Sequence, residues 1–89
     1  MIIGKVVGSI VSTRKSDKLI GNKLMIIQPL DSMKSNTNQL VAIDNIGAGV
    51  GEIVLVALGS AARIGCGVEM APVDAAIVGI VDEGIGVEY

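Results

Sequence analysis

The amino-acid sequence predicts an all-β fold, in the form of a small closed or nearly closed barrel. Short runs of aliphatic and β-branched residues recur along the chain, and clusters of glycine, proline or small polar residues separate them. A series of short strands with Gly-rich turns and little helix is typical of small barrels. With 89 residues, the chain is expected to form a single domain spanning residues 1–89.

Five strands are expected, and their predicted ranges are 2–11, 23–28, 39–44, 52–58 and 75–81. The first strand contains Gly4 and Gly8. Glycine inside a strand often marks a bulge, a sharp bend or a close approach of another backbone, as in a strand that coils around a barrel. Pro29 is expected to end the second strand, because proline has no N–H to donate to a strand ladder.

A glycine turn, residues 45–51, joins the third and fourth strands, and its glycines follow the spacing G-x-G-x-G. The dinucleotide-binding fingerprint is G-x-G-x-x-G and precedes a helix, whereas here a strand follows. The Lys-Ser/Thr pair of a phosphate-binding loop is also missing. The motif therefore argues against nucleotide binding and favours a tight turn in which glycines adopt positive φ.

The segment after the fourth strand, residues 59–63, consists of small residues and one arginine. We expect it to begin a short helical turn, with Ser60 as the N-cap. The glycines of the next segment, residues 64–71, argue against a long helix there.

The composition favours an oligomer. Hydrophobic residues make up 51% of the chain, and only one residue, Tyr89, is aromatic. A domain this small buries only about two-thirds of the surface that its unfolded chain exposes. Soluble monomers rarely expose large apolar patches, so burial between identical subunits is the expected solution.

The charge and the residue types exclude several classes of function. The net charge of −2 is unfavourable for binding nucleic acid, which needs a basic surface. No apolar run approaches the ~18 residues of a transmembrane helix, and no signal peptide is evident, so neither a membrane nor export is expected. The chain has no histidine and one cysteine, Cys66, and its carboxylates are scattered, so no catalytic, metal or cofactor site is expected.

Several motifs, in order, resemble the EutN/CcmL family of vertex proteins from bacterial microcompartment shells. The most specific are the glycine turn followed by an apolar strand, and the small-residue turn with an arginine that follows this strand. The opening strand and loop, the second strand and the closing strand also resemble the family, and their ranges are 6–15, 19–31 and 72–82. The resemblance covers nearly all of the chain.

This resemblance implies a five-stranded, OB-like barrel with one short helix, assembled as a cyclic homopentamer. It implies a structural protein, not an enzyme, that caps the vertices of a polyhedral shell in the bacterial cytoplasm. The partners that it implies are hexameric and trimeric shell proteins. It also implies that subunit or shell contacts involve the glycine turn and the segment after the fourth strand, specifically Gly47, Ala48, Gly49, Gly51, Glu52, Ser60 and Arg63.

Two of these residues carry sharper expectations. Gly49 is expected either to adopt a backbone geometry that is costly for other residues or to lie against a neighbouring chain. Arg63 is expected to donate hydrogen bonds across an interface, and Glu52 and Asp74 are candidate acceptors for its guanidinium. The alternative is that Arg63 is an ordinary solvated arginine.

One alternative function from another class is an OB-fold module that binds single-stranded nucleic acid. Such modules stack bases on aromatic side chains within a basic groove. A single aromatic residue and a net negative charge make this alternative the weaker one.

Overall fold

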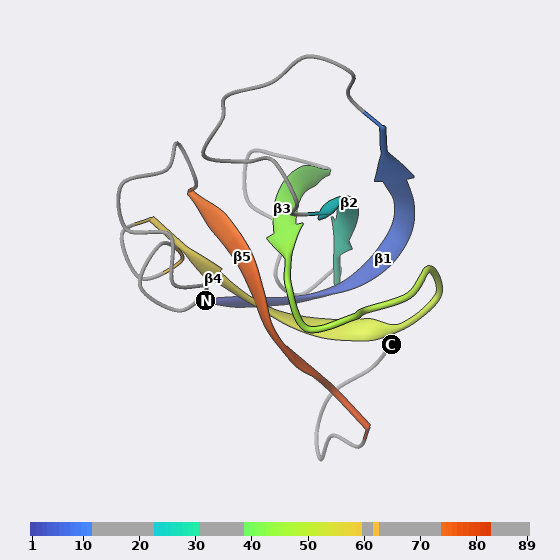
Figure 1. Ribbon diagram of the computed structural model, residues 1–89. Helices are drawn as coiled ribbons and strands as arrows, with labels where there is room; N and C mark the ends of the chain where they lie inside the picture. Colours follow the sequence, from blue (N-terminus) through green and yellow to red (C-terminus); the bar gives the residue numbers. More distant parts are fainter. Residues whose placement is uncertain (12–22, 31–38, 60–61, 63–73, 83–89) are drawn as a thin grey trace.

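The computed structural model describes residues 1–11, 23–30, 39–59, 62 and 74–82. Within these residues, five strands form a closed barrel in the order β1-β2-β3-β5-β4 (Figure 1). The strands are β1 (Ile2–Ile10), β2 (Lys23–Pro29), β3 (Leu40–Asp44), β4 (Ile53–Leu58) and β5 (Ala75–Ile80). The all-β barrel that the sequence predicts is therefore confirmed.

The pairing around the barrel is uneven. β1 pairs antiparallel with both β2 and β4, and β2–β3 and β4–β5 are also antiparallel. The circle is completed by a parallel pair, β3–β5, in which a single pair of residues, Ile43 and Ala76, is in register. The β3–β5 seam therefore has the fewest main-chain contacts of the five.

The predicted strand bounds agree with the observed ones to within one residue, with one correction. Pro29 belongs to β2 as its last residue, opposite Gly4, and does not lie beyond it. A proline is tolerated there because the strand ends at this point. The pairing continues for one more residue, since the Leu30 amide donates to the Ile3 carbonyl at 3.1 Å.

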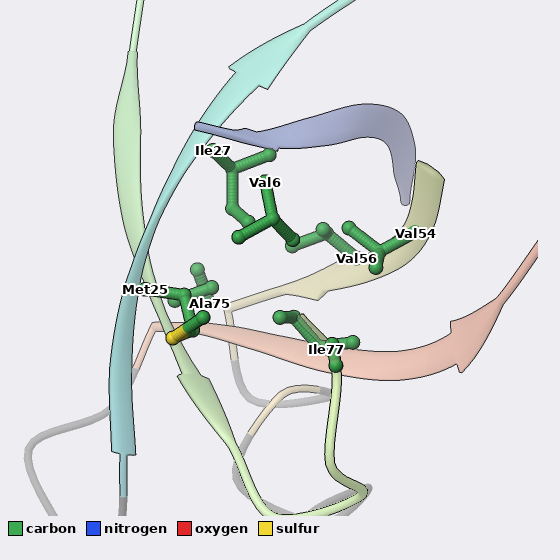
Figure 2. Packing of buried hydrophobic residues seen from close by; sticks show 9 residues of the cluster. Val6, Met25, Ile27, Val54, Val56, Ala75 and Ile77 are labelled. Carbon is green, nitrogen blue, oxygen red and sulfur yellow. The ribbon is translucent and has the colours of Figure 1, made fainter. Parts of the chain in front are cut away.

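The interior of the barrel is filled by one aliphatic cluster, to which all five strands contribute (Figure 2). Strand residues alternate between the two faces of a sheet, and β2 follows this rule, with Met25 and Ile27 pointing inward. Figure 2 shows Ile27 near Val6 and Met25 near Ala75, with Val56 and Ile77 directed into the same interior from the other walls. The full set of buried members is Val6, Met25, Ile27, Ala42, Ala48, Val54, Val56, Ala75 and Ile77.

A second cluster lies on the outer face of the barrel, over the parallel seam. Its buried members are Ile43 of β3, Ala76 of β5, Ala57 of β4 and Ala62. Ala62 is fully buried. The wall formed by β3, β5 and β4 is therefore covered on both faces, as is usual around parallel strands.

The two glycines of β1 have different structural roles, both among those expected. A Cβ at Gly4 would lie 2.5 Å from Ile27 Cγ2 and 2.9 Å from the Gln28 carbonyl oxygen, so β1 and β2 approach closely there. In the β1–β2 pairing, the register shifts between Val6 and Gly8. It marks a bulge, which bends the strand around the barrel.

Candidate functional site

The glycine turn, residues 45–51, is bonded to the barrel wall. The Gly51 amide donates to the Val6 carbonyl at 2.8 Å, and the Val6 amide donates to the Glu52 carbonyl at 2.9 Å. These bonds continue the β1–β4 pairing into the two residues that precede β4. The base of the turn is thus held by the same wall that positions the inner core.

The last part of the turn is a β-turn over residues 49–52, closed by a 3.1 Å hydrogen bond from the Glu52 amide to the Gly49 carbonyl. Gly51 is its third residue and has φ +96°. A type II turn requires positive φ at this position, which is why glycine is favoured there. Gly47 also has positive φ, at +88°.

Two carboxylates hold the backbone of the turn from its two ends. Asp44, the last residue of β3, accepts hydrogen bonds at Oδ1 from the amides of Ile46 (3.0 Å) and Gly47 (3.2 Å). Glu52, just before β4, accepts a 2.6 Å hydrogen bond at Oε1 from the Gly49 amide. Hydrogen bonds to an ionised acceptor are stronger than neutral ones. The conformation of the turn is therefore fixed within the chain.

Asp44 was not among the predicted site residues. Asp44 is only 2% exposed, and its Oδ2 is buried with no hydrogen-bond partner among the described residues. The available signal was an aspartate at the end of a strand, two and three residues before the amides that it binds, which is the arrangement of an Asx turn. The burial itself could not be read from the sequence, because aspartate is mostly exposed in proteins.

The predicted residues of the turn occupy different environments. Gly47 and Gly51 are exposed and Gly49 is partly buried, whereas Ala48 is buried among the inner core residues. The first alternative expected for Gly49, a costly backbone geometry, is wrong, because its φ is not positive. The second alternative, contact with a neighbouring chain, stays a prediction. A Cβ at Gly49 would meet one atom within 4 Å, Glu52 Oε1 at 3.2 Å.

The rim of the turn carries apolar side chains that face outward. Val50 is 63% exposed and Ile46 is 46% exposed. Val7, one residue beyond the point where the turn is bonded to β1, is 42% exposed. Exposed aliphatic residues gathered at one place are a common feature of surfaces that bind another protein.

The second predicted group, after β4, falls mainly outside the described residues. Ser60, Arg63 and Cys66 are outside them, as is most of the expected helical turn. At its start, the Ala62 amide donates to the Gly59 carbonyl at 3.1 Å, and Gly59 has φ +65°. Of the two candidate acceptors for Arg63, Glu52 already binds Gly49, while Asp74 is exposed.

The described part of the chain has neither a candidate metal site nor a membrane helix. It contains no group of three or more cysteine, aspartate or glutamate side chains that could hold a metal ion. Among the same residues, no helix has the length and apolar character needed to cross a bilayer.

Comparison with known proteins identifies one family. The family described as "Ethanolamine utilisation protein EutN/carboxysome" matches residues 1–82. The microcompartment shell vertex protein GrpN of Rhodospirillum rubrum is 45% identical over 83 residues, which cover 92% of this chain and 93% of GrpN. The carboxysome shell vertex protein CcmL of Nostoc sp. PCC 7120 is 48% identical over 84 residues, which cover 92% of this chain and 83% of CcmL.

Solved structures give the same result. The pentameric shell protein GrpN of Rhodospirillum rubrum superposes with a TM-score of 0.83 at 42% identity, covering 98% of this chain and all of GrpN (100%). The ethanolamine utilisation protein EutN superposes with a TM-score of 0.86 at 41% identity, covering 97% of this chain and 91% of EutN.

Proposed function

Because the chain belongs to the EutN/CcmL family of microcompartment shell vertex proteins, we propose that its glycine turn is a contact surface of the assembled shell. The protein is a structural component of a bacterial microcompartment shell, in the bacterial cytoplasm, and forms pentamers at the vertices. These relatives favour the vertex function over the single-stranded nucleic-acid module that was the alternative.

The pentamer has a geometric task. A layer of six-sided tiles remains flat, and it closes into a polyhedron only when five-sided units occupy its corners. The proposed partners are therefore hexameric and trimeric shell proteins, which would meet the outer edges of the pentamer. The proposed role is structural and not catalytic, which agrees with a chain that has no histidine.

The observation that carries the proposal is the combination of a fixed backbone and outward apolar side chains in the turn. Asp44 and Glu52 bind three of its amides, so the turn loses little conformational entropy when a partner binds it. Val50 and Ile46 face away from the barrel and are not part of its core. The proposed contact set is Ile46, Gly47, Gly49, Val50, Gly51 and Glu52, with Ser60 and Arg63 from the segment after β4. Ala48, which the sequence placed in this set, is buried in the barrel core and is left out of it.

The test is to place a charge on the rim of the turn and to follow assembly. Val50→Lys should leave the barrel folded by circular dichroism, because Val50 is 63% exposed. It should reduce either the pentamer, measured by native mass spectrometry, or its incorporation into shells reconstituted with hexameric proteins. Loss of the pentamer indicates a subunit contact, and loss of incorporation alone indicates a tile contact.

Arg63→Ala is the corresponding test for the second group and is expected to weaken assembly while the barrel remains folded. Val41→Lys serves as a matched control, since Val41 is 47% exposed and lies on β3, outside the proposed contact set. Wild-type pentamers and wild-type incorporation for both Val50→Lys and Arg63→Ala would contradict the proposed contact surface.

A further inference from the structure

Among the described residues, one side of β5 has no partner strand along most of its length. β5 pairs with β4 from Ala75 to Ile80, but on its other side only Ala76 is in register with β3. Within the described part of the chain, no further backbone pairing involves that side of β5 between residues 77 and 80. An unpaired strand side presents a row of amide and carbonyl groups that can pair with another chain.

The unpaired part of β5 is also the accessible part. Burial decreases along the strand, from Ile77, which is 1% exposed, through Val78 and Gly79, which are partly buried, to Ile80, which is 36% exposed. Figure 1 shows the second half of β5 running past the end of β3, where it remains paired with β4. We call residues 78–80 the free edge of β5.

The free edge has few of the features that protect exposed edges. Proteins usually block such edges with lysine, proline or an inward-facing charge, but residues 77–81 are Ile-Val-Gly-Ile-Val. A register irregularity next to Val78 is the one protective feature of this segment. An edge of this composition is expected to be covered in the functional state of the protein.

Gly79 supports the same interpretation. Its φ is not positive, and among the described residues a Cβ there would meet the Leu55 side chain alone, at ordinary contact distances of 3.7 and 4.0 Å. The described part of the fold therefore does not require glycine at this position. A glycine in a strand also permits another backbone to approach closely, and this explanation remains for Gly79.

The free edge adjoins the proposed contact surface. The Val81 amide donates to the Ile53 carbonyl at 2.8 Å, and Ile53 directly follows Glu52, which caps the glycine turn. The end of β5 and the base of the turn are thus joined through one hydrogen bond. A partner that covers the turn is well placed to cover the edge too.

We propose that the free edge of β5 binds a second copy of this chain, through main-chain hydrogen bonds between adjacent subunits of the pentamer. This inference rests on the pentameric assembly described above. Cyclic assemblies use heterologous contacts, in which each subunit offers one surface to one neighbour and a different surface to the other. Strand addition at an exposed sheet edge is an established way to make such a contact.

The test compares two edge variants with the control Val41→Lys. Gly79→Glu places a charged side chain on the free edge, and Ile80→Lys replaces its most exposed apolar residue. Native mass spectrometry at micromolar concentration should show that the pentamer population of each edge variant is at least tenfold smaller than that of the wild type. Val41→Lys should remain pentameric. Circular dichroism should show that all three variants are folded.

Amide hydrogen exchange tests the main-chain contact directly, and it does not depend on a variant that folds. In the wild-type pentamer, the amides of Val78 and Ile80 should exchange at least tenfold more slowly than in subunits dissociated by dilution. Gly79→Ala, which adds one methyl group within ordinary contact distance of Leu55, should fold and weaken the pentamer.

The outcomes separate this inference from the proposed function. Pentameric edge variants, together with fast exchange at Val78 and Ile80 in the wild-type pentamer, would overturn the edge contact and leave the vertex function standing. A wild-type chain that forms no pentamer would overturn both.

Discussion

Two glycine-containing regions, the barrel wall at Gly4 and the glycine turn at residues 45–51, differ in what surrounds the missing side chain. At Gly4, the backbone oxygen of Gln28 and the side chain of Ile27 occupy the space that a Cβ would need. At Gly49, only one carboxylate oxygen of Glu52 lies within 4 Å of that space. The first glycine is required by the fold of the chain itself.

The difference separates two reasons for a glycine. Gly47 and Gly51 have positive φ, so the turn conformation accounts for them. Gly49 has neither positive φ nor a backbone atom in its way. The lack of a side chain at Gly49 is explained by the capping carboxylate of Glu52, by a partner outside the chain, or by both. Four substitutions test this contrast.

The largest effect is expected for Gly4→Ala. The added methyl group would collide with a backbone oxygen that is fixed by the β1–β2 pairing, and overpacking of this kind costs about 3 kcal/mol. For a domain whose total stability is on the order of 5–15 kcal/mol, this is a severe loss. Urea unfolding should show this loss of stability. The protein concentration must be held fixed, because assembly adds stability.

The matched control for this prediction is Gly8→Ala in the same strand. A Cβ at Gly8 would meet only the Ile26 side chain, at 3.5 Å or more, and Gly8 does not have positive φ. The free energy of unfolding of Gly8→Ala should differ from that of the wild type by less than about 0.5 kcal/mol. Equal losses for the two variants would contradict the close approach as the reason for Gly4, because a change from glycine to alanine at a compatible backbone conformation otherwise stabilises the folded state.

A smaller loss, about 2 kcal/mol, is expected for Asp44→Ala. The substitution removes the acceptor for the amides of Ile46 and Gly47, and unsatisfied donors are costly, although solvent reaches this exposed part of the turn. Asp44→Asn retains an oxygen at the Oδ1 position and should lose about half as much. If Asp44→Ala matched the wild type in urea unfolding, the capping hydrogen bonds would contribute nothing to stability.

The barrel and the turn also differ in how much of them could be predicted from sequence. The strands were predictable because aliphatic runs such as residues 53–58 are bounded by turn residues on both sides. The parallel pairing of Ile43 with Ala76 was not, since it joins residues far apart in the chain and depends on how the barrel closes. The burial of Asp44 was missed for a similar reason, because it depends on how the turn folds back over the barrel.

The candidate site was predictable mainly through its family motifs. The spacing of Gly47, Gly49 and Gly51 indicated a tight turn, but it could not show which glycines have positive φ. It also could not show that Ala48 points into the core, because one residue in a turn carries no periodic pattern. The hydrogen bond that links the Gly49 amide to Glu52 became visible only in the structure.

For Gly49→Val, the expected loss of stability is about 1 kcal/mol, together with weakened assembly. The stability loss should come from crowding of the Glu52 carboxylate, which is the one neighbour of the new Cβ among the described residues. A double-mutant cycle with Glu52→Ala separates the two explanations for this glycine. If the carboxylate alone matters, Gly49→Val in the Glu52→Ala background should leave assembly unchanged relative to Glu52→Ala.

If a neighbouring subunit lies against Gly49, the assembly defect should persist in that background. Native mass spectrometry gives the assembly state, and urea unfolding gives the stability. A Gly49→Val protein with wild-type stability and wild-type oligomer mass would remove both reasons for glycine at this position.

The smallest effect is expected for Glu52→Gln, about 0.5 kcal/mol. Glutamine retains an Oε1 atom that can accept from the Gly49 amide, so the hydrogen bond survives and only the contribution of the negative charge is lost. Because the Glu52 side chain is only partly buried, solvent screens that charge and keeps the loss small. Glu52→Ala, which removes the acceptor, should cost about 1 kcal/mol more than Glu52→Gln. Wild-type pentamers for Glu52→Gln but not for Glu52→Ala would show that the turn must be capped, not charged, in order to assemble. Loss of the pentamer in Glu52→Gln, with the free energy of unfolding unchanged, would instead mean that the carboxylate itself meets a positive group of the neighbouring subunit. The turn would then differ from the barrel wall in charge as well as in packing.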